Sequence, residues 1–264
     1  MIEYIENNIC NERILIITDI HNCHIDWYDT KNDDRMSVLC SALKEQYKST
    51  PYDCILSLGD YSLDFWKWQI GGSYLWSPPV SRTTEFMEKY ASRFPAKAYF
   101  LAGNHEQYGN EKWQEITGNP REFAVVYGNY VFAMLDTFAG DLDPTENHDG
   151  VYTGINTEFL TAILKKHPDK KIVLCAHDIV PEKESNEAKS IICSENRILC
   201  AFTGHTHDSD IKITGNDMRN LPIIYCGNFS YSVSDKPKNW GYRILNLSDG
   251  NFSTEYIVNT TQNS

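Results

Sequence analysis

Side chains that bind metal ions follow several apolar runs in this chain, at the points where the runs end. Carboxylate, carboxamide and imidazole groups are common protein ligands of divalent and transition metals. Each apolar run reads as a buried strand, so its end begins a loop that can present such groups. The sequence therefore predicts a metal site built from strand ends. The segments that form it are Asp19-Ile20-His21, Gly59-Asp60, Gly103-Asn104-His105-Glu106, the single His177, and Gly204-His205-Thr206-His207.

The spacing inside these segments lets neighbouring ligands share one cavity. Residues two apart on an extended backbone point to the same side, so Asp19 can act with His21, and His205 with His207. Three of the segments begin with glycine, which permits tight turns and a close approach of the backbone that other residues resist. We therefore expect a compact cluster. These glycines are Gly59, Gly103 and Gly204.

The candidate ligands are too many for one tetrahedral ion. Two aspartates, one asparagine and four histidines are present besides His105, and this set suits two ions that share a carboxylate. Mixed oxygen and imidazole ligands suit Mn²⁺, Fe, Zn²⁺, Co²⁺ or Ni²⁺. We expect Mn²⁺ first, although the ligand set by itself does not select the metal. A single strand-end histidine is more often structural, so the prediction depends on five segments in succession.

The order D-x-H, G-D, G-N-H-E, a lone H and G-H-x-H resembles the calcineurin-like metallophosphoesterase family. The resemblance implies a β-sandwich with helices outside and a site on loops at the strand ends. It also implies a first metal position, a second metal position, a bridging carboxylate and a histidine that faces the substrate. In that order, the residues would be Asp19, His21 and His207; Asn104, His177 and His205; Asp60; and His105.

The same resemblance implies a hydrolase that cleaves a phosphomonoester or a phosphodiester. A water or hydroxide that bridges the two ions would attack phosphorus, while His105 would stabilise the developing charge or protonate the leaving oxygen. We expect a small-molecule phosphoester as substrate. Two alternatives stay open: a Ser/Thr protein phosphatase, and a non-catalytic adaptor that keeps the fold and the metals but binds proteins. Every ligand position is filled, which favours an enzyme.

Departures from two subgroups of the family narrow this prediction. Purple acid phosphatases carry a tyrosine where Leu63 stands and a glycine where His21 stands, so we do not expect iron bound to a tyrosinate. Protein Ser/Thr phosphatases carry G-D-x-x-D-R-G, whereas residues 59–65 read G-D-Y-S-L-D-F, so their phosphate-binding arginine is missing. Asp64 also lies one place later than the aspartate that supports their histidine. A pairing of Asp64 with His105 is therefore not expected.

Four further residues are predicted to contact the substrate. Asn22, directly after the first ligand segment, would add a polar contact, and His24 would lie at the rim. Residues 65–79 follow the Asp60 loop and are rich in Trp, Tyr, Gly and Pro. Within them, Trp66 and Trp68 would stack on a nucleoside or another planar leaving group. The alternative is that this aromatic segment forms a buried cluster or a dimer contact.

Apolar runs separated by turn residues predict an α/β (α+β) fold. Strands alternate with helices at first, which indicates βαβ units, and the last third is rich in strands. We expect two packed mixed sheets flanked by helices, a four-layer αββα sandwich, in one domain over 1–264 with a loose tail at 258–264. Predicted strands cover 14–17, 54–58, 99–101, 125–126, 130–135, 172–175, 198–203, 211–214, 222–226, 242–247 and 252–258; predicted helices cover roughly 33–48, 81–92, 156–166 and 186–193.

Charge and composition exclude several classes of protein. A net charge of −12 argues against non-specific binding to a nucleic-acid polymer, although two bound cations would still attract a phosphate group. We find no apolar run long enough for a membrane helix and no signal peptide, so we expect a cytoplasmic protein without a membrane partner. The eight cysteines contain no C-x-x-C pair, which favours buried free thiols. The sequence does not predict an oligomeric state.

Overall fold

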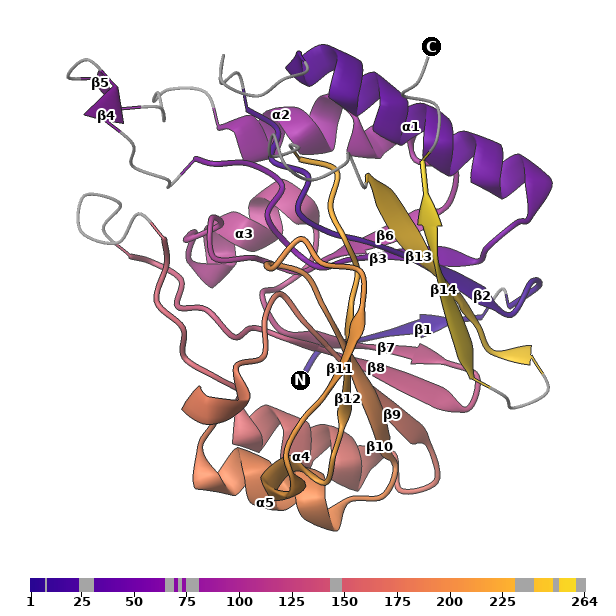
Figure 1. The fold of residues 1–264 in the computed structure, drawn as a ribbon, viewed down its shortest axis with the longest axis vertical. Coiled ribbons are helices and arrows are strands. Elements are labelled where there is room, and N and C mark those ends of the chain that lie inside the picture. Colours follow the sequence, from indigo (N-terminus) through magenta and orange to yellow (C-terminus); the bar gives the residue numbers. More distant parts are fainter. Residues whose placement is uncertain are drawn as a thin grey trace.

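Two β-sheets pack face to face in the computed structural model of this chain, with helices on both outer faces (Figure 1). The structure describes residues 1–7, 9–23, 31–64, 69–70, 73–74, 81–142, 149–230, 240–248 and 252–259. The predicted fold class, two packed mixed sheets flanked by helices, is confirmed.

A five-stranded sheet carries the first three ligand segments. Strands β2, β3 and β6 run parallel to one another, and β13 is antiparallel to both of its neighbours. Three helices and a short 3-10 turn pack on its outer face (Figure 1). In spatial order the strands are β14 (Ser253–Val258), β13 (Gly241–Asn246), β2 (Arg13–Ile17), β3 (Cys54–Ser57) and β6 (Lys97–Phe100); the helices are α1 (Asn32–Ser49), α2 (Arg82–Lys89), α3 (Asn110–Thr117) and η1 (Ala91–Arg93).

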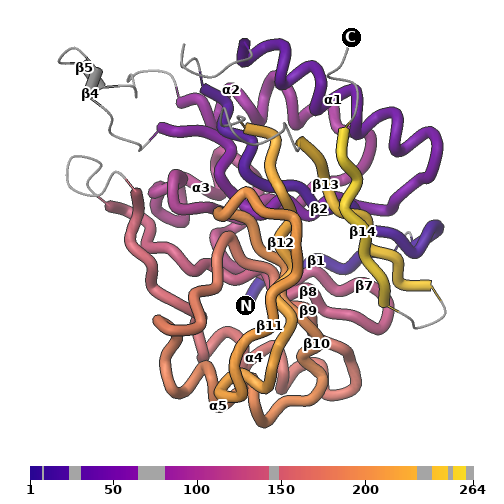
Figure 2. The backbone as a smooth tube through the Cα atoms, in the orientation of Figure 1, coloured from indigo at the N-terminus to yellow at the C-terminus, as the bar shows by residue number. Residues whose placement is uncertain are grey.

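A seven-stranded sheet carries the other two ligand segments. Its order brings the N-terminal strand β1 beside β7 from the middle of the chain (Figure 2). Helices α4 and α5 cover its outer face (Figure 1). In spatial order the strands are β1 (Glu3–Glu6), β7 (Phe123–Tyr127), β8 (Tyr130–Leu135), β9 (Lys171–Ala176), β10 (Ile198–Thr203), β12 (Pro222–Tyr225) and β11 (Ile211–Ile213); the helical elements are α4 (Thr157–Lys166), α5 (Asn186–Ser194), η2 (Pro181–Lys183) and η3 (Asn216–Met218), and a separate hairpin pairs β4 (Gln69–Ile70) with β5 (Ser73–Tyr74).

Alternation along the strands divides the core into layers. In β2, Ile14 and Ile16 face the other sheet, whereas Leu15 and Ile17 face the helices. All four side chains are fully buried. Burial on both faces of a parallel strand explains why these segments read as continuous apolar runs in the sequence. The two faces together fix the strands whose ends carry the candidate ligands.

The structure contains elements that the sequence did not predict, among them β1 and α3. β1 has no clear apolar pattern in the sequence. Its Ile5 is 60% exposed, and the ring of its Tyr4 packs against the rings of Tyr99 and Phe123. α3 buries Trp113 alone, so it lacks the repeated apolar positions that indicate a helix. None of the helices in the described parts of the chain has the length and apolar character needed to cross a bilayer.

Two smaller predictions are corrected. Val258 belongs to β14 and the Asn259 N–H donates to the Trp240 carbonyl at 2.7 Å, so residues 258 and 259 are not a loose tail. All eight cysteines are free, as predicted, but Cys10 and Cys193 are exposed rather than buried. A turn at Gly128, which has a positive φ of 55°, joins β7 to β8.

The candidate ligands lie just beyond the carboxyl ends of five strands: β2, β3 and β6 in one sheet, and β9 and β10 in the other. Backbone bonds join these strand ends. The Asp19 N–H donates to Gly59 O at 3.1 Å, and the Gly204 N–H donates to His177 O at 2.9 Å. The topology therefore brings segments that are nearly 190 residues apart in sequence to one place.

We predict that this layered core supplies most of the stability. Ile16→Ala should lower the free energy of unfolding by ~2–5 kcal/mol because it opens a cavity between the sheets. The same change at Ile213, which is 60% exposed on the edge strand β11, should cost less than ~1 kcal/mol. Urea denaturation of both variants measures the difference, and similar losses at the two positions would contradict the layered core.

Candidate metal centre

Candidate ligand atoms from both sheets converge into one cluster. Three groups each hold three such atoms, and the atoms of a group lie within 4.8 Å of one another. Neighbouring groups share a residue, so the cluster is continuous. The groups are Asp19, His21 and His207; His21, Asp60 and His105; and Asp60, His177 and His205.

The Asp19 carboxylate has one oxygen held by the protein and one directed at a histidine. Oδ2 accepts hydrogen bonds from the Thr18 hydroxyl at 2.8 Å and from the His205 backbone N–H at 2.9 Å. Oδ1 is buried, accepts no hydrogen bond from the part of the chain that the structure describes, and lies 3.3 Å from His207 Nε2. A buried carboxylate oxygen without a donor is costly. A cation between Oδ1 and the imidazole would satisfy both groups.

The second half of the cluster places acceptor atoms against one another. Asn104 Oδ1 lies 2.9 Å from His177 Nε2 and 3.0 Å from His205 Nδ1, and Asp60 Oδ2 lies 3.1 Å from His177 Nε2. Amide and carboxylate oxygens carry no protons at neutral pH, so such closeness requires a shared cation or protonated imidazoles. This donor set fits a divalent or transition metal.

Hydrogen bonds on the outer sides of His177 and Asn104 fix which of their atoms face the cluster. His177 Nδ1 lies 2.8 Å from the Leu58 carbonyl, a contact in which Nδ1 must be the donor, so in the neutral imidazole Nε2 carries the lone pair and faces the cluster. The Asn104 Nδ2 donates to the Asp149 carbonyl at 3.2 Å, which turns Oδ1 toward the histidines. Such outer bonds commonly orient metal ligands.

Asp60 stands at the centre of the cluster. Its Oδ2 lies 3.4 Å from His21 Nε2 on one side and 3.1 Å from His177 Nε2 on the other, and its side chain is almost fully buried. Its Oδ1 accepts the His105 backbone N–H at 3.2 Å. A carboxylate that reaches both halves in this way can be shared by two ions.

Opposite charges set the protonation of the central pair. Burial acts to raise the pKa of Asp60, but His177 and then His105 hold this pKa well below its ordinary value of 3.8. Burial acts to lower the pKa of His177, but Asp60 beside it raises this pKa to about 10. In the metal-free protein a proton on His177 therefore occupies the place that suits a cation.

Left-handed backbone recurs at the candidate ligands. Non-glycine residues with positive φ are uncommon because the side chain crowds the carbonyl, and they concentrate at functional sites where surrounding contacts hold them. Nine such residues occur in the described chain, and five of them are candidate ligands. The five are Asp19 (φ 52°), His21 (48°), Asp60 (58°), His205 (65°) and His207 (60°).

Glycines allow the close backbone approach that the sequence predicted. A Cβ on Gly103 would lie 2.2 Å from Asp60 Oδ1, and one on Gly204 would lie 2.0 Å from the Thr18 hydroxyl oxygen. Gly59 has φ of +105°, and a Cβ there would meet the Gly103 backbone at 2.6 Å. Any side chain at these positions would push the ligand loops apart.

The Glu106 carboxylate joins two ligand loops. Its Oε2 accepts the backbone N–H groups of Asp60 at 2.8 Å and Gly103 at 3.0 Å. Its Oε1 accepts those of Tyr61 at 2.9 Å and Ser62 at 3.2 Å. Glu106 therefore positions the Asp60 loop and does not face the cluster as a ligand.

Arg35, which the sequence did not single out, supports the first ligand loop from α1. It is fully buried, and its guanidinium donates to the carbonyls of Ile20 at 2.8 Å, His21 at 2.7 Å and Phe229 at 2.9 Å. The Phe229 N–H in turn donates to Asp19 O at 3.0 Å. A charged residue among the apolar positions of α1 was the available signal.

Asn22 lies beside the cluster in a structural position. It is fully buried; its Oδ1 accepts from Asn32 at 2.8 Å, and its Nδ2 donates to the Arg82 carbonyl at 2.8 Å. These hydrogen bonds tie the first ligand loop to α1 and α2, and the substrate contact of Asn22 stays a prediction. The other predicted contacts, His24, Trp66 and Trp68, lie outside the described residues.

His105 is the candidate for contact with the substrate. It is 7% exposed, its Nε2 lies 3.8 Å from Asp60 Oδ2, and burial lowers its pKa below 6.5. Asp64 accepts instead from the Tyr108 hydroxyl at 2.6 Å and from the backbone N–H groups of Arg82 and Thr83 at the start of α2. This placement agrees with the expectation that Asp64 does not serve His105.

Tyr61 is the tyrosine that lies next to Asp60 in sequence, and it faces away from the cluster. Its hydroxyl donates to the carbonyls of Ser57 and Leu101, each at 2.9 Å, and its ring is fully buried against Phe86. Burial raises the pKa of Tyr61 well above 10, so the phenol stays protonated. A tyrosinate ligand at this position is therefore not formed.

Comparisons with known proteins agree with this geometry. The model of the calcineurin-like phosphoesterase family matches residues 12–209. No match to the chain was found among curated protein sequences. Solved structures of similar fold include a purple acid phosphatase from yellow lupin seeds, with a TM-score of 0.56 and 12% identity over 95% of this chain. The chain spans about half of that phosphatase, 52% of its length.

Two further structures share the fold at low identity. GAP50, described as the anchor in the inner membrane complex of Plasmodium, has a TM-score of 0.55 and 14% identity, covering 94% of this chain and 85% of that one. A 5'-nucleotidase from Candida albicans has a TM-score of 0.51 and 14% identity, covering 95% and 52%. The family match spans most of the sequence and includes all five ligand segments, so this chain belongs to the calcineurin-like phosphoesterase family.

Proposed function

We propose that this protein is a binuclear metal-dependent phosphohydrolase that cleaves a small phosphomonoester or phosphodiester. The observation behind the proposal is the set of inward-facing acceptor atoms on Asn104, His177, His205 and Asp60, which lie 2.9–3.1 Å apart along their contacts. A bound cation would satisfy these acceptor atoms together. The family match supports hydrolysis of a phosphoric ester.

In this proposal the residues would divide into two metal positions and a shared carboxylate. Two ions bound here would supply an activated water nucleophile and neutralise the phosphoryl oxygens. Asp60 would hold both ions at a fixed separation, and the outer bonds to His177 and Asn104 would keep their ligand atoms aimed inward. Asp19, His21 and His207 would form the first position; Asn104, His177 and His205 would form the second.

His105 would act on the substrate. Its backbone N–H is held by Asp60 Oδ1 at 3.2 Å, and its ring stands edge-on to His21 at 5.5 Å between centroids. From there the imidazole would donate to a phosphoryl oxygen or pass a proton to the leaving oxygen. Mn²⁺ is our first candidate metal, with Fe, Zn²⁺, Co²⁺ and Ni²⁺ as alternatives.

A small substrate agrees with the charge of the protein. The net charge of −12 repels a polyanion such as nucleic acid, whereas bound cations attract a single phosphoryl group locally. The arginine that serves phosphate binding in the protein Ser/Thr phosphatases is absent after Asp60, which weighs against that alternative. We also place the protein in the cytoplasm, in keeping with its eight free cysteines.

The alternative is a non-catalytic adaptor. The fold likeness to GAP50, which is described as an anchor, keeps this possibility in view. An adaptor that keeps the metals would share the left-handed ligand residues, so metal binding alone does not separate the two functions. Hydrolysis of a phosphoester separates them, and the family match favours the enzyme.

Asp60→Asn should reduce hydrolysis of bis-p-nitrophenyl phosphate and p-nitrophenyl phosphate at least about 100-fold in kcat/KM, because the shared anionic ligand is lost. Chelation should abolish the activity, and Mn²⁺ should restore it. Asp169→Asn, the same change at an exposed turn, is the control and should be fully active. A pure protein that is inert with every divalent metal, or an Asp60→Asn variant with normal activity, would contradict the proposal.

His105→Ala should lower kcat by about 10²–10⁴ while the protein keeps both metal ions, because the imidazole acts on the substrate. If it protonates the leaving oxygen, the loss should be larger for an alkyl phosphate than for p-nitrophenyl phosphate, whose leaving group needs no proton. Metal content by mass spectrometry and kcat for the two substrates provide the measurements. Loss of a metal ion with His105→Ala would show that the residue is a ligand instead.

Metal affinity should increase with pH. His177 holds its proton up to about pH 10 in the metal-free protein, so a metal ion must displace this proton. Lower pH favours the proton, and the apparent affinity should fall about tenfold per pH unit for each proton displaced. Calorimetric titration in buffers of different ionisation enthalpy counts the released protons. Affinity that is constant from about pH 6.5 to 8.5 would contradict this coupling.

A further inference from the structure

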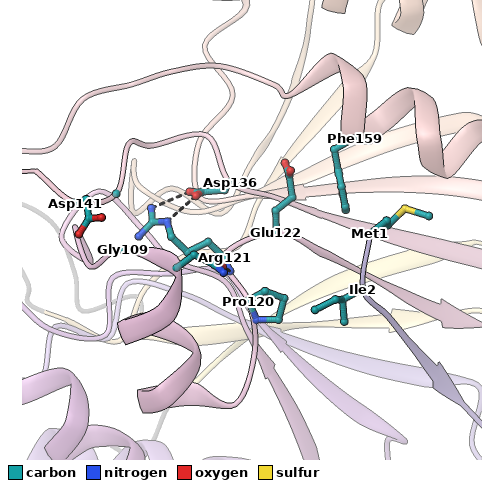
Figure 3. A pocket seen from close by; sticks show the side chains of 11 residues that line it. Met1, Ile2, Gly109, Pro120, Arg121, Glu122, Asp136, Asp141 and Phe159 are labelled. Atoms are coloured by element: carbon teal, nitrogen blue, oxygen red, sulfur yellow. Dashed lines mark hydrogen bonds and ion pairs between the residues drawn. The ribbon is translucent and has the colours of Figure 1, made fainter.

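Arg121, which lies outside every ligand motif, uses all five N–H donors of its guanidinium. Nε and Nη2 form a two-pronged pair with Asp136 at 2.6 and 2.9 Å (Figure 3). Nη1 donates to the carbonyls of Glu106 at 2.6 Å and Tyr108 at 2.8 Å, and Nη2 also donates to the Phe138 carbonyl at 2.9 Å. The side chain is almost fully buried.

These bonds connect two loops that surround the second half of the metal centre. One loop carries Asn104 and continues through Glu106 to Tyr108, and the other follows β8 from Asp136 to Phe138. Figure 3 shows Arg121 and Asp136 together among the residues that line an open pocket. The volume of this cavity is about 540 Å³. The candidate ligands do not line this cavity, so Arg121 holds the loops from behind.

Phe138 links Arg121 to the histidines, because Arg121 binds its backbone carbonyl and its ring contacts both imidazoles. Its ring centroid lies 5.8 Å from that of His177 and 5.9 Å from that of His205. The two imidazoles also contact one another at 5.2 Å between centroids. A ring wedged against both imidazoles restricts the planes they adopt, and Arg121 fixes the backbone of this ring.

We propose that Arg121 is a positioning residue for the second metal position, formed by Asn104, His177 and His205. It reaches Asn104 through the loop carbonyls of Glu106 and Tyr108, and the histidines through Phe138. Its planar fork satisfies five acceptors at once, whereas a lysine has one nitrogen and no fork. The inference rests on the proposed two-metal centre.

The test uses a protein with one metal position left. His207→Ala removes a ligand of the first position, and the second position then accounts for the metal that this parent binds. In this background, Arg121→Lys should weaken binding of Mn²⁺ about 10–100-fold, as measured by competition with a chelating dye. Excess Mn²⁺ should restore the bound ion, which a misfolded site would not recover.

Arg197→Lys in the same background is the matched control. Arg197 also pairs with a carboxylate, Glu195, and donates to loop carbonyls, those of Leu164 and His167, but it precedes β10 at the end away from the centre. Its Mn²⁺ affinity should stay within about twofold of the parent, because its contacts do not reach the ligands.

The outcomes separate the inference from the proposed function. Equal Mn²⁺ affinity in the parent and in Arg121→Lys overturns the inference and leaves the proposed function intact. A parent that binds no metal, together with a wild-type protein that binds none, overturns the proposed function itself. If Arg121→Lys does not fold, Asp136→Asn keeps the arginine and weakens its ion pair. That variant should also lose Mn²⁺ affinity, and unchanged affinity there would overturn the inference.

Discussion

The structure depends on one constraint: several atoms that are acceptors when the histidines are neutral must face one another across about 3 Å. Asn104 Oδ1, Asp60 Oδ2 and the inner nitrogens of His177 and His205 meet in this way. Hydrogen bonds on the outer sides of His177 and Asn104 turn their ligand atoms inward, and the loops that carry Asp60 and His205 do the same for those residues. Without a cation, Asp60 raises the pKa of His177 to about 10, so a proton on His177 fills the space. The fold supplies strand ends from two sheets so that these atoms can meet.

Holding that arrangement requires backbone that most residues avoid. Five candidate ligands have left-handed φ angles, and each tends to relax unless its neighbours hold it. Two buried polar side chains serve this purpose on the loops nearest the centre. Arg35 binds the carbonyls around His21, and Glu106 binds four N–H groups around Asp60 and Gly103. The bonds are made to backbone atoms, so they fix the loops whatever side chains the loops present.

Part of this could be predicted from the sequence because it is local. Apolar runs followed by D-x-H, G-N-H-E and G-H-x-H indicated the strands, their ends and the cluster, and the glycines indicated close loops. Arg121 gave no such signal, and Arg35 gave only its place among the apolar positions of α1, since their partners are carbonyls that any sequence provides and that only the fold brings near. α3 was missed for a similar reason: it buries Trp113 alone. The buried position of Asn22 likewise depends on α1 and α2, which the motif around it does not contain.

The central claim is that Asp60 joins two metal positions. Anomalous diffraction from crystals grown with Mn²⁺ tests it most directly, because the peaks locate the ions without reference to activity. The account predicts two peaks about 3.5–4 Å apart, one near Asp19 and His207 and the other near His177 and His205, with Asp60 between them. A single peak at full Mn²⁺ occupancy, or two peaks of which Asp60 touches one at most, would contradict it.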